Sequence, residues 1–179
     1  QPKKIKTSSW IFMHKRSEIL RMPMGVVAVI SPWNYPLAIP FGEIIMGLMA
    51  GNAVVLKVAS NVEKVGDIIE DIVKAGELPP GLFVRLKGGG AQVSETMLAS
   101  GVDKIFFTGS VAVGKELMEK AAKTLTPLSL ELGGNDPMVV FADADLERAS
   151  NGAVWGGYQN AGQTCGGGER IYVEEKIYK

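Results

Sequence analysis

The sequence predicts an α/β fold built on a doubly wound, open parallel sheet. Apolar runs of strand length alternate along the chain with longer segments of helical pattern. The runs are continuously apolar, which is typical of strands that are covered on both faces. Because strands and helices alternate, consecutive strands are expected to run parallel and to be joined by right-handed crossovers. With 46% hydrophobic residues among 179, the chain can bury a core of this kind.

The expected elements follow from these runs in chain order. Strands are predicted at residues 26–30, 53–56, 82–86, 105–107, 128–132 and 138–141. Helices are predicted between them at residues 40–49, 63–74, 93–99 and 111–123. Ser110 and Asp145 are expected to cap the helices that begin after them, whereas Gly51 and Gly76 fit helix ends.

Polar residues and glycines directly follow several of these strands. In open parallel sheets ligands bind beyond the carboxyl ends of the strands, so these positions are candidates for a site. They are Ser31 to Asn34, Lys57, the glycines at 88–90, Thr108 to Ser110, and Gly133 with Gly134. Bare amides and helix N-termini attract anions, so a phosphate-bearing ligand is expected. The spacing from Gly109 to Gly114 matches neither G-x-G-x-x-G nor a P-loop, which disfavours a conventional Rossmann fingerprint and an NTPase.

Cys165 is the only cysteine and lies among glycines, with Gly162 before it and glycines at 166–168 after it. A free cysteine usually packs as a small buried hydrophobe, and that reading is the alternative for Cys165. The glycines leave little side-chain bulk around the thiol, which favours a covalent nucleophile instead. Since His14 is the only histidine, the chain alone can form neither a cysteine–histidine zinc cluster nor a cysteine–histidine catalytic pair, and no metal site is predicted.

Composition narrows the possible partners. The 19 basic and 19 acidic residues cancel, so binding to nucleic acid or to an anionic membrane is not expected. The most apolar stretch, residues 36–50, is interrupted by Pro40 and Glu43 and is shorter than the roughly 20 residues of a membrane span. No signal peptide is recognised, and we expect a cytoplasmic protein. Because the chain begins at Gln1 and stops after a strand-like run, we expect it to be a piece of a longer protein.

Several motifs occur in a fixed order along the chain. They are Pro23-Met24-Gly25-Val26-Val27 leading to Ser31-Pro32-Trp33-Asn34-Tyr35-Pro36, Lys57 after its strand, Phe107-Thr108-Gly109-Ser110 with Gly114, Leu130-Glu131-Leu132-Gly133-Gly134, and Asn160 to Cys165 with Arg170. With these motifs the sequence resembles the aldehyde dehydrogenase superfamily from about residue 23 to residue 179. The resemblance implies a dinucleotide-binding domain of aldehyde dehydrogenase type at 23–133 and the start of a second α/β catalytic domain at 134–179. It also implies a hairpin-like segment at 1–22 that pairs subunits, in a homodimer or homotetramer of the full-length protein.

The resemblance assigns roles to individual residues. Cys165 would be the nucleophile, Glu131 the general base, and Asn34 the side chain that binds the oxyanion together with the Cys165 amide. Lys57 would hold the adenosine ribose of NAD or NADP, and Trp33 and Ser110 would lie by the pyrophosphate. Further cofactor contacts are predicted at Ser31, Ser60, Gly90, Gly109 and Leu132. Taken singly, Glu131 could simply end a strand, Asn34 could cap a loop, and Lys57 could be a solvated charge.

The implied activity is oxidation of an aldehyde to a carboxylic acid through a thiohemiacetal and a thioester on Cys165. These residue types suit the chemistry, since a thiolate can add to a carbonyl, amide N–H groups can stabilise the oxyanion, and a carboxylate can activate water. One alternative is an acylating enzyme that transfers the thioester to coenzyme A, which Glu131 disfavours because such enzymes commonly lack the base. Another is an inactive, truncated cofactor-binding piece. The aldehyde itself is left open, since semialdehyde, aliphatic and aromatic substrates all fit.

Position 60 departs from the pattern of the family. Relatives often carry a glutamate three residues after the lysine, where its carboxylate would bind the adenosine ribose and repel a 2′-phosphate. This chain has Ser60 there, and a serine hydroxyl can donate to a phosphate. NADP is therefore expected to be tolerated and is a candidate for the preferred cofactor.

Overall fold

A computed structural model describes residues 3–5 and 10–178 of the chain. Its largest part is a five-stranded sheet in the order β5-β4-β3-β6-β7, in which every pairing is parallel. The strands are β3 (Val26–Ile30), β4 (Ala53–Lys57), β5 (Phe83–Arg85), β6 (Lys104–Gly109) and β7 (Leu128–Leu132). The first strand of this sheet, β3, pairs with both β4 and β6, so the strand order reverses beside it. Such a switch point is where open parallel sheets bind ligands.

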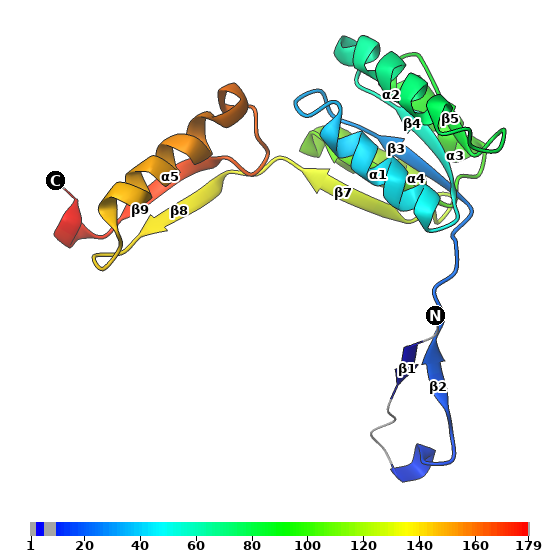
Figure 1. The fold of residues 1–179 in the computed structure, drawn as a ribbon, viewed down its shortest axis with the longest axis horizontal. Coiled ribbons are helices and arrows are strands. Elements are labelled where there is room, and N and C mark those ends of the chain that lie inside the picture. The colour runs from blue at the N-terminus through cyan, green and yellow to red at the C-terminus, as the bar shows by residue number, and fades with distance from the viewer. Residues whose placement is uncertain (1–2, 6–9, 179) are drawn as a thin grey trace.

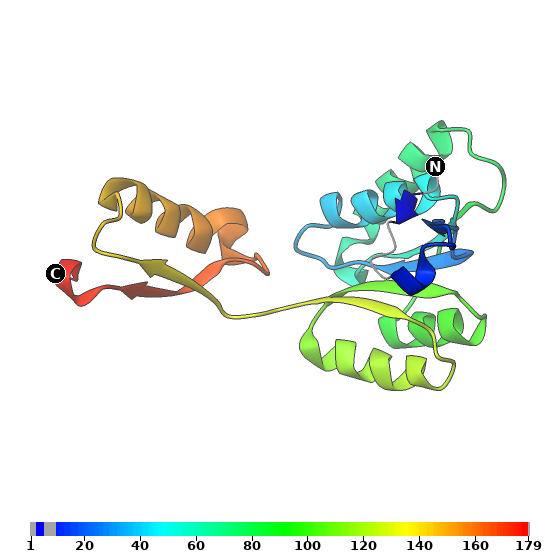
Figure 2. The same ribbon diagram turned by 90° about the horizontal axis from the view of Figure 1, so that it is seen from below.

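Helices cover both faces of this sheet, as Figure 2 shows from below. The four helices are α1 (Ala38–Met49), α2 (Glu63–Ala75), α3 (Gly90–Ala99) and α4 (Val111–Ala122). Successive strand residues point to opposite faces, and β3 illustrates this with Val29 in the core under α1 and α2 and Ala28 in the core under α3 and α4. The doubly wound fold predicted from the continuous apolar runs is confirmed.

Two smaller units flank the sheet (Figure 1). At the N-terminal side, β1 (Lys3–Ile5) and β2 (Ser17–Ile19) pair antiparallel around the 3₁₀ helix η1 (Trp10–Phe12). At the C-terminal side, β8 (Asp136–Val140) and β9 (Gly168–Val173) pair in parallel and are joined through α5 (Leu146–Tyr158). Short 3₁₀ helices complete the chain: η2 (Ser60–Val62), η3 (Gln159–Gly162) and η4 (Glu175–Ile177). Residues 22 and 133 lie between these units, and the division of the chain into three domains stays a prediction.

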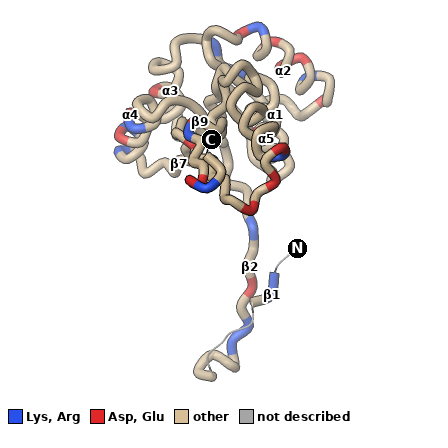
Figure 3. The backbone as a smooth tube through the Cα atoms, turned by 90° about the vertical axis from the view of Figure 1, so that its left-hand side faces the viewer, with Lys and Arg blue, Asp and Glu red and all other residues tan. Residues whose placement is uncertain are grey.

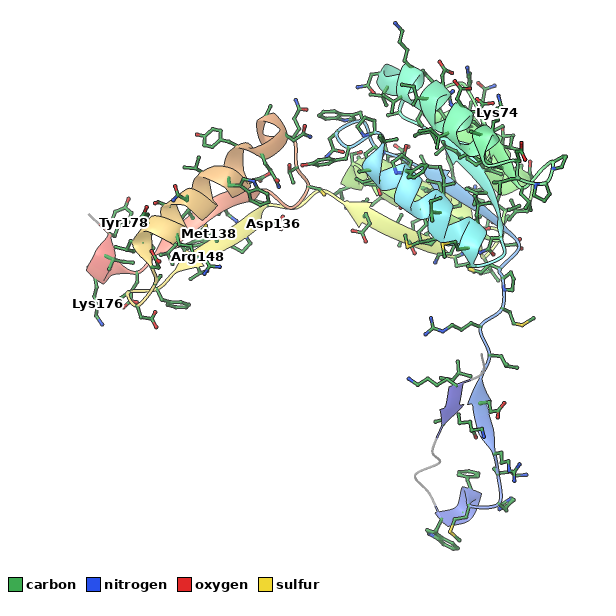
Figure 4. All side chains as sticks on the ribbon, in the orientation of Figure 1. Lys74, Asp136, Met138, Arg148, Lys176 and Tyr178 are labelled. Carbon is green, nitrogen blue, oxygen red and sulfur yellow. The ribbon has the colours of Figure 1, made fainter. Side chains whose placement is uncertain are left out.

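The hairpin formed by β1 and β2 lies apart from the five-stranded sheet, with its side chains drawn as sticks in Figure 4. Trp10 and Met13 are each 78% exposed, so large apolar surface faces solvent. The predicted segment at 1–22 includes residues 1–2 and 6–9, which lie outside the described residues. Elsewhere charges of both signs are mixed along α2 and α4 (Figure 3). No helix in the described part of the chain is long and apolar enough to cross a membrane.

The observed element boundaries differ from the predicted ones in two instructive places. The strand predicted at 138–141 is β8, which starts at Asp136 and pairs with β9 instead of extending the large sheet. The helix predicted from Val93 begins at Gly90, because apolar spacing marks the buried face of a helix and its exposed first turn carries no such signal.

The capping predictions for two helices are confirmed. The side chain of Ser110 accepts a hydrogen bond from Val113 N at 3.3 Å, and that of Asp145 accepts one from Arg148 N at 3.1 Å. Gly51 follows α1 with φ +85°, a left-handed conformation that favours glycine.

Asn52 connects the start of β3 to the end of α1. This buried side chain accepts hydrogen bonds from Met24 N at 2.6 Å and Gly25 N at 3.1 Å, and it donates to Gly47 O at 3.0 Å. Its amide thereby fixes where the central strand begins.

We predict that Asn52→Ala destabilises the fold, because the part-buried backbone N–H groups of Met24 and Gly25 lose their acceptor, whereas Gly47 O keeps the bond from the backbone N–H of Asn52. The expected loss is about 2–3 kcal/mol in the free energy of unfolding. Urea denaturation of the full-length protein would measure it, with Asn151→Ala on the exposed surface of α5 as the matched control. Equal midpoints for the two variants would contradict the role given to Asn52.

Candidate active site

A cavity of about 800 Å³ lies at the carboxyl ends of the central strands and extends to the loop that holds Cys165. Every residue predicted for the site lines this cavity: Ser31, Trp33, Asn34, Lys57, Ser60, Gly90, Gly109, Ser110, Glu131, Leu132 and Cys165. They come from both the five-stranded sheet and the β8-α5-β9 unit. The structure thus brings the predicted residues together, while the role of each one stays a prediction.

The alternation of β7 determines where Glu131 points. The leucines of this strand, at positions 128, 130 and 132, pack against the core under α3 and α4. Residues of the other parity point to the opposite face, so Glu131 is directed toward the face covered by α1. Its register partner on β6 is Thr108, whose buried Oγ1 has no hydrogen-bond partner among the described residues.

Hydrogen bonds join the loop after β3 to the loop before Cys165. Asn34 Nδ2 donates to Gln163 O at 2.8 Å, and Asn160 Nδ2 donates to Asn34 O at 2.9 Å. The hydroxyls of Tyr35 and Thr164 are hydrogen-bonded at 2.8 Å. These contacts hold Asn34 beside the loop that carries the thiol, although the two lie far apart in sequence.

The backbone before the exposed Cys165 is unusual. Asn160, Ala161 and Gly162 have φ values of 51°, 58° and 74°, so three consecutive residues adopt left-handed conformations. Asparagine and glycine tolerate left-handed backbone, whereas it destabilises alanine by roughly 1–2 kcal/mol. A strained backbone conformation persists only where surrounding contacts hold it. Here the hydrogen bonds to the loop after β3 hold it.

Lys57 is buried, with 3% of its side chain exposed. Its Nζ donates to Val58 O and lies 3.4 Å from Glu63 Oε1. Arg85 binds the other carboxylate oxygen of Glu63. Hydrogen bonds from Lys87 and from Arg85 hold the pKa of Asp67 at about 2. The alternative interpretation of Lys57 as a solvated surface charge is therefore wrong, because its ammonium belongs to a network of charged side chains at the cavity.

The cavity suits a dinucleotide. The N-termini of α3 and α4 open into it at Gly90 and Ser110, where N–H groups and helix dipoles favour a pyrophosphate. Space is open around Gly90 and Gly133 where a Cβ would stand, so a ligand can approach the backbone closely. Trp33 is half exposed at the same edge and offers an aromatic surface. In the described part of the chain no cluster of three or more His, Cys, Asp or Glu side chains could hold a metal ion.

Sequence reasoning missed several residues around the site. Tyr35, Asn160 and Thr164 lie within the motifs, but their contacts join loops that are distant in sequence, and nothing in the local pattern indicates those contacts. Glu43 did leave a signal, since it is the only ionisable residue of the apolar helix α1. Burial, and then the charge of Glu131, raise the pKa of Glu43 to about 7. Its Oε2 is buried and has no hydrogen-bond partner among the described residues.

Comparisons with known proteins show the family to which the chain belongs. Residues 1–179 match the family model of the aldehyde dehydrogenase family. The chain is 42% identical over 174 residues to 4,4'-diapolycopene aldehyde oxidase of a Methylomonas species, covering 97% of this chain and 33% of that protein. It is 39% identical over 165 residues to the NADP(+) succinate-semialdehyde dehydrogenase of Escherichia coli K12, covering 92% and 34%. The chain spans about a third of the length of these curated relatives.

A solved structure shows the same likeness. Betaine aldehyde dehydrogenase from Staphylococcus aureus in complex with NAD+ is similar to this chain with a TM-score of 0.87 and 34% identity. The similarity covers 98% of this chain and 34% of that one.

The strained loop before Cys165 yields a stability prediction. Asn160→Ala should lower the free energy of unfolding by about 2 kcal/mol, because it removes a hydrogen bond and places alanine in left-handed backbone. In Asn160→Gly the loss in the free energy of unfolding should be about 1 kcal/mol smaller, because glycine adopts left-handed backbone without strain and only the side-chain hydrogen bond is removed. Urea denaturation of the full-length variants measures both, and an alanine variant as stable as the glycine variant would refute the strain argument.

Proposed function

The chain belongs to the aldehyde dehydrogenase family, and we propose that the full-length protein oxidises an aldehyde to a carboxylic acid with NAD or NADP. The observation that carries the proposal is the meeting of Cys165, Asn34 and Glu131 around one cavity. A thiol, an amide donor and a carboxylate are the groups that a covalent route to an acid requires. Succinate-semialdehyde and betaine aldehyde dehydrogenases among the similar proteins support an aldehyde as substrate.

In this mechanism Cys165 Sγ, as a thiolate, adds to the carbonyl carbon and forms a thiohemiacetal whose oxygen carries the negative charge. The Cys165 amide N–H and Asn34 Nδ2 stabilise this oxygen. Asn34 Nδ2 has two hydrogens, and its bond to Gln163 O uses one and leaves the other for the oxyanion. The nicotinamide supplies a hydride acceptor when the cofactor is bound, and the adduct becomes a thioester.

Glu131 serves the second half of the reaction. Its carboxylate removes a proton from water, and the resulting hydroxide adds to the thioester carbon. The carbon–sulfur bond then breaks, so Cys165 leaves as a thiolate and the acid is released. A positioned base of this kind contributes about 100- to 10,000-fold in rate. The presence of Glu131 favours water over coenzyme A as the acceptor of the acyl group.

For the cofactor, we propose that Ser60 permits NADP. Its exposed hydroxyl lines the main cavity and also a smaller recess with Glu63, Lys87 and Gly88. The carboxylate of Glu63 is already bound to Lys57 and Arg85, so its charge opposes a 2′-phosphate less than an unpaired carboxylate would. Similar proteins include both an NADP(+) enzyme and one bound to NAD+.

The remaining proposals concern the whole protein. The exposed apolar side chains of the hairpin suit pairing of subunits in a homodimer or homotetramer. We also propose a cytoplasmic location, which suits a reactive thiol that must stay reduced.

The catalytic roles can be separated by kinetics on the full-length protein. Cys165→Ala should abolish aldehyde-dependent reduction of the nicotinamide, because no adduct can form. Glu131→Gln should still release about one equivalent of reduced cofactor in a burst and then turn over roughly 100- to 10,000-fold more slowly, since only deacylation needs the base. Stopped-flow absorbance of the reduced cofactor distinguishes the two variants. Turnover that survives in Cys165→Ala would eliminate the assignment, and formation of an acyl-coenzyme A thioester in place of the acid would favour the acylating alternative.

Cofactor selection is tested at position 60. In Ser60→Glu the ratio of kcat/KM for NADP to kcat/KM for NAD should fall at least tenfold, because the new carboxylate repels the 2′-phosphate and accepts hydrogen bonds from a free ribose. Ser60→Ala is the matched control, which removes the hydroxyl without adding charge and should lower the ratio less. An unchanged ratio of the two kcat/KM values in Ser60→Glu would show that position 60 does not distinguish NADP from NAD.

A further inference from the structure

Glu169 is a charged residue of the cavity to which the proposed reaction gives no role. It is exposed, and it lines the same cavity as Cys165 and Glu131. It follows the glycines after Cys165, at the start of β9. Exposed carboxylates carry a negative charge at neutral pH. The exposed thiol therefore shares its cavity with two anionic side chains.

A β-bulge determines the setting of Glu169. In the ladder of β8 with β9, Asp136 pairs with Gly168 and Pro137 pairs with Arg170, so the register passes over Glu169. A residue that is left out of a ladder in this way changes the direction of its side chain, and such bulges are common next to active sites. The irregular register thus accounts for a strand residue that lines the cavity.

A third carboxylate lies beside the loop of the thiol. Asp136, at the start of β8 (Figure 4), has its Oδ2 3.9 Å from the position that a Cβ would take on Gly166. Gly166 is the residue next to Cys165. In the described part of the chain no salt bridge involves Glu131, Asp136 or Glu169. Ion pairs within that part therefore leave these three negative charges in place.

The lysines of the cavity do not compensate these charges. Lys57 and Lys120 line the cavity, and they form salt bridges with Glu63 and Glu95. Among the described residues no further lysine or arginine lines it. An anionic ligand group would therefore meet carboxylates whose charge is not balanced and ammonium groups that already have partners.

Arg170 directly follows Glu169, but its guanidinium binds elsewhere. Its Nε donates to Asn135 O at 2.9 Å, and its Nη1 donates to the hydroxyl of Tyr172 at 3.3 Å. The guanidinium carbon also lies 5.9 Å from the centre of the Tyr172 ring. Arg170 does not line the cavity, so it offers no cation to a ligand there.

Uncharged polar groups complete the cavity wall. Thr108 is only 8% exposed, lines the cavity, and has an Oγ1 without a hydrogen-bond partner among the described residues. Asn34 Nδ2 keeps one hydrogen free after its bond to Gln163 O. A hydroxyl and an amide can bind a neutral carbonyl, but they offset the repulsion between like charges only weakly.

We propose that Glu169 is a specificity-determining residue whose charge, together with that of Glu131, disfavours anionic aldehydes at Cys165. The full-length protein then prefers aldehydes that carry no negative charge. By Coulomb's law, one like charge about 8 Å away in a medium with a dielectric constant of about 40 slows the approach of an anion roughly fivefold. This inference rests on the proposed function and narrows its substrate class.

The first experiment measures the electrostatic field at the thiol and needs no turnover. The full-length protein is alkylated with iodoacetamide, which is neutral, and with iodoacetate, which is an anion. Mass spectrometry of the peptide that contains Cys165 gives the two rate constants. The ratio of the iodoacetamide to the iodoacetate rate constant should fall about fivefold in Glu169→Gln, because one repelling charge is removed. A change in the reactivity of the thiol itself affects both reagents and cancels in the ratio.

Glu175→Gln is the matched control for this experiment. Glu175 is exposed in η4 of the same unit and does not line the cavity, so its loss should leave the ratio unchanged. Added salt should lower the ratio in wild type, because ions screen exposed charges. Equal ratios in wild type and Glu169→Gln, or an equal fall in Glu175→Gln, would overturn the role of Glu169. If Glu169→Gln does not fold, a wild-type ratio that is insensitive to salt overturns it.

Kinetics supply the second readout. Butanal and succinate semialdehyde both have four carbons and differ by one carboxylate. In wild type kcat/KM should be about tenfold higher for butanal, and in Glu169→Gln the ratio of the two kcat/KM values should fall about fivefold. A wild-type protein that prefers succinate semialdehyde would contradict the proposed selection.

The two readouts separate this inference from the proposed function. A protein whose thiol discriminates between the two alkylating reagents as expected, but that oxidises neither aldehyde, would refute the function and keep the role of Glu169. Oxidation of both aldehydes with equal efficiency, together with an unchanged alkylation ratio in Glu169→Gln, would refute that role and keep the function.

Discussion

The hydrogen bonds between the loop after β3 and the loop before Cys165 are the contacts on which the candidate site depends. Glu131 and Asn34 belong to the five-stranded sheet and its loops, whereas Cys165 belongs to the β8-α5-β9 unit. Within residues 3–5 and 10–178, no strand ladder joins the two sheets. The amide of Asn34, the amide of Asn160 and the paired hydroxyls of Tyr35 and Thr164 make the connection instead. The geometry between nucleophile and oxyanion donor is therefore set by side chains.

That connection also explains the backbone before the thiol. A left-handed run through Ala161 would relax if the loop were free, since alanine prefers other conformations. Asn160 tolerates this backbone conformation, and its side chain donates a hydrogen bond to Asn34 O. That bond holds the loop in the strained conformation. The same residues that join the units thus orient the loop in which Cys165 is exposed.

The sequence predicted those features that depend on neighbouring residues, and it did not predict contacts between residues that are distant in sequence. Val26–Ile30 was predicted to the residue, because a strand buried on both faces is apolar throughout. Leu128–Leu132 was also predicted to the residue, and there the leucines alternate with Ser129 and Glu131. The residues after those strands were predicted to share a site, and they line one cavity. Glu63 as the partner of Lys57 could not be predicted, because that pairing depends on how η2 and α2 follow β4 in space. The contact of Tyr35 with Thr164 has the same origin.

The distribution of charge in the cavity bears on how an oxyanion can be held there. Lys57 forms a salt bridge with Glu63, and Lys120 forms one with Glu95, so the positive charges of these two side chains at the cavity are neutralised. Glu131 adds a negative charge to the same space. A developing alkoxide would therefore find more repulsion than attraction from whole charges and must be stabilised by N–H dipoles.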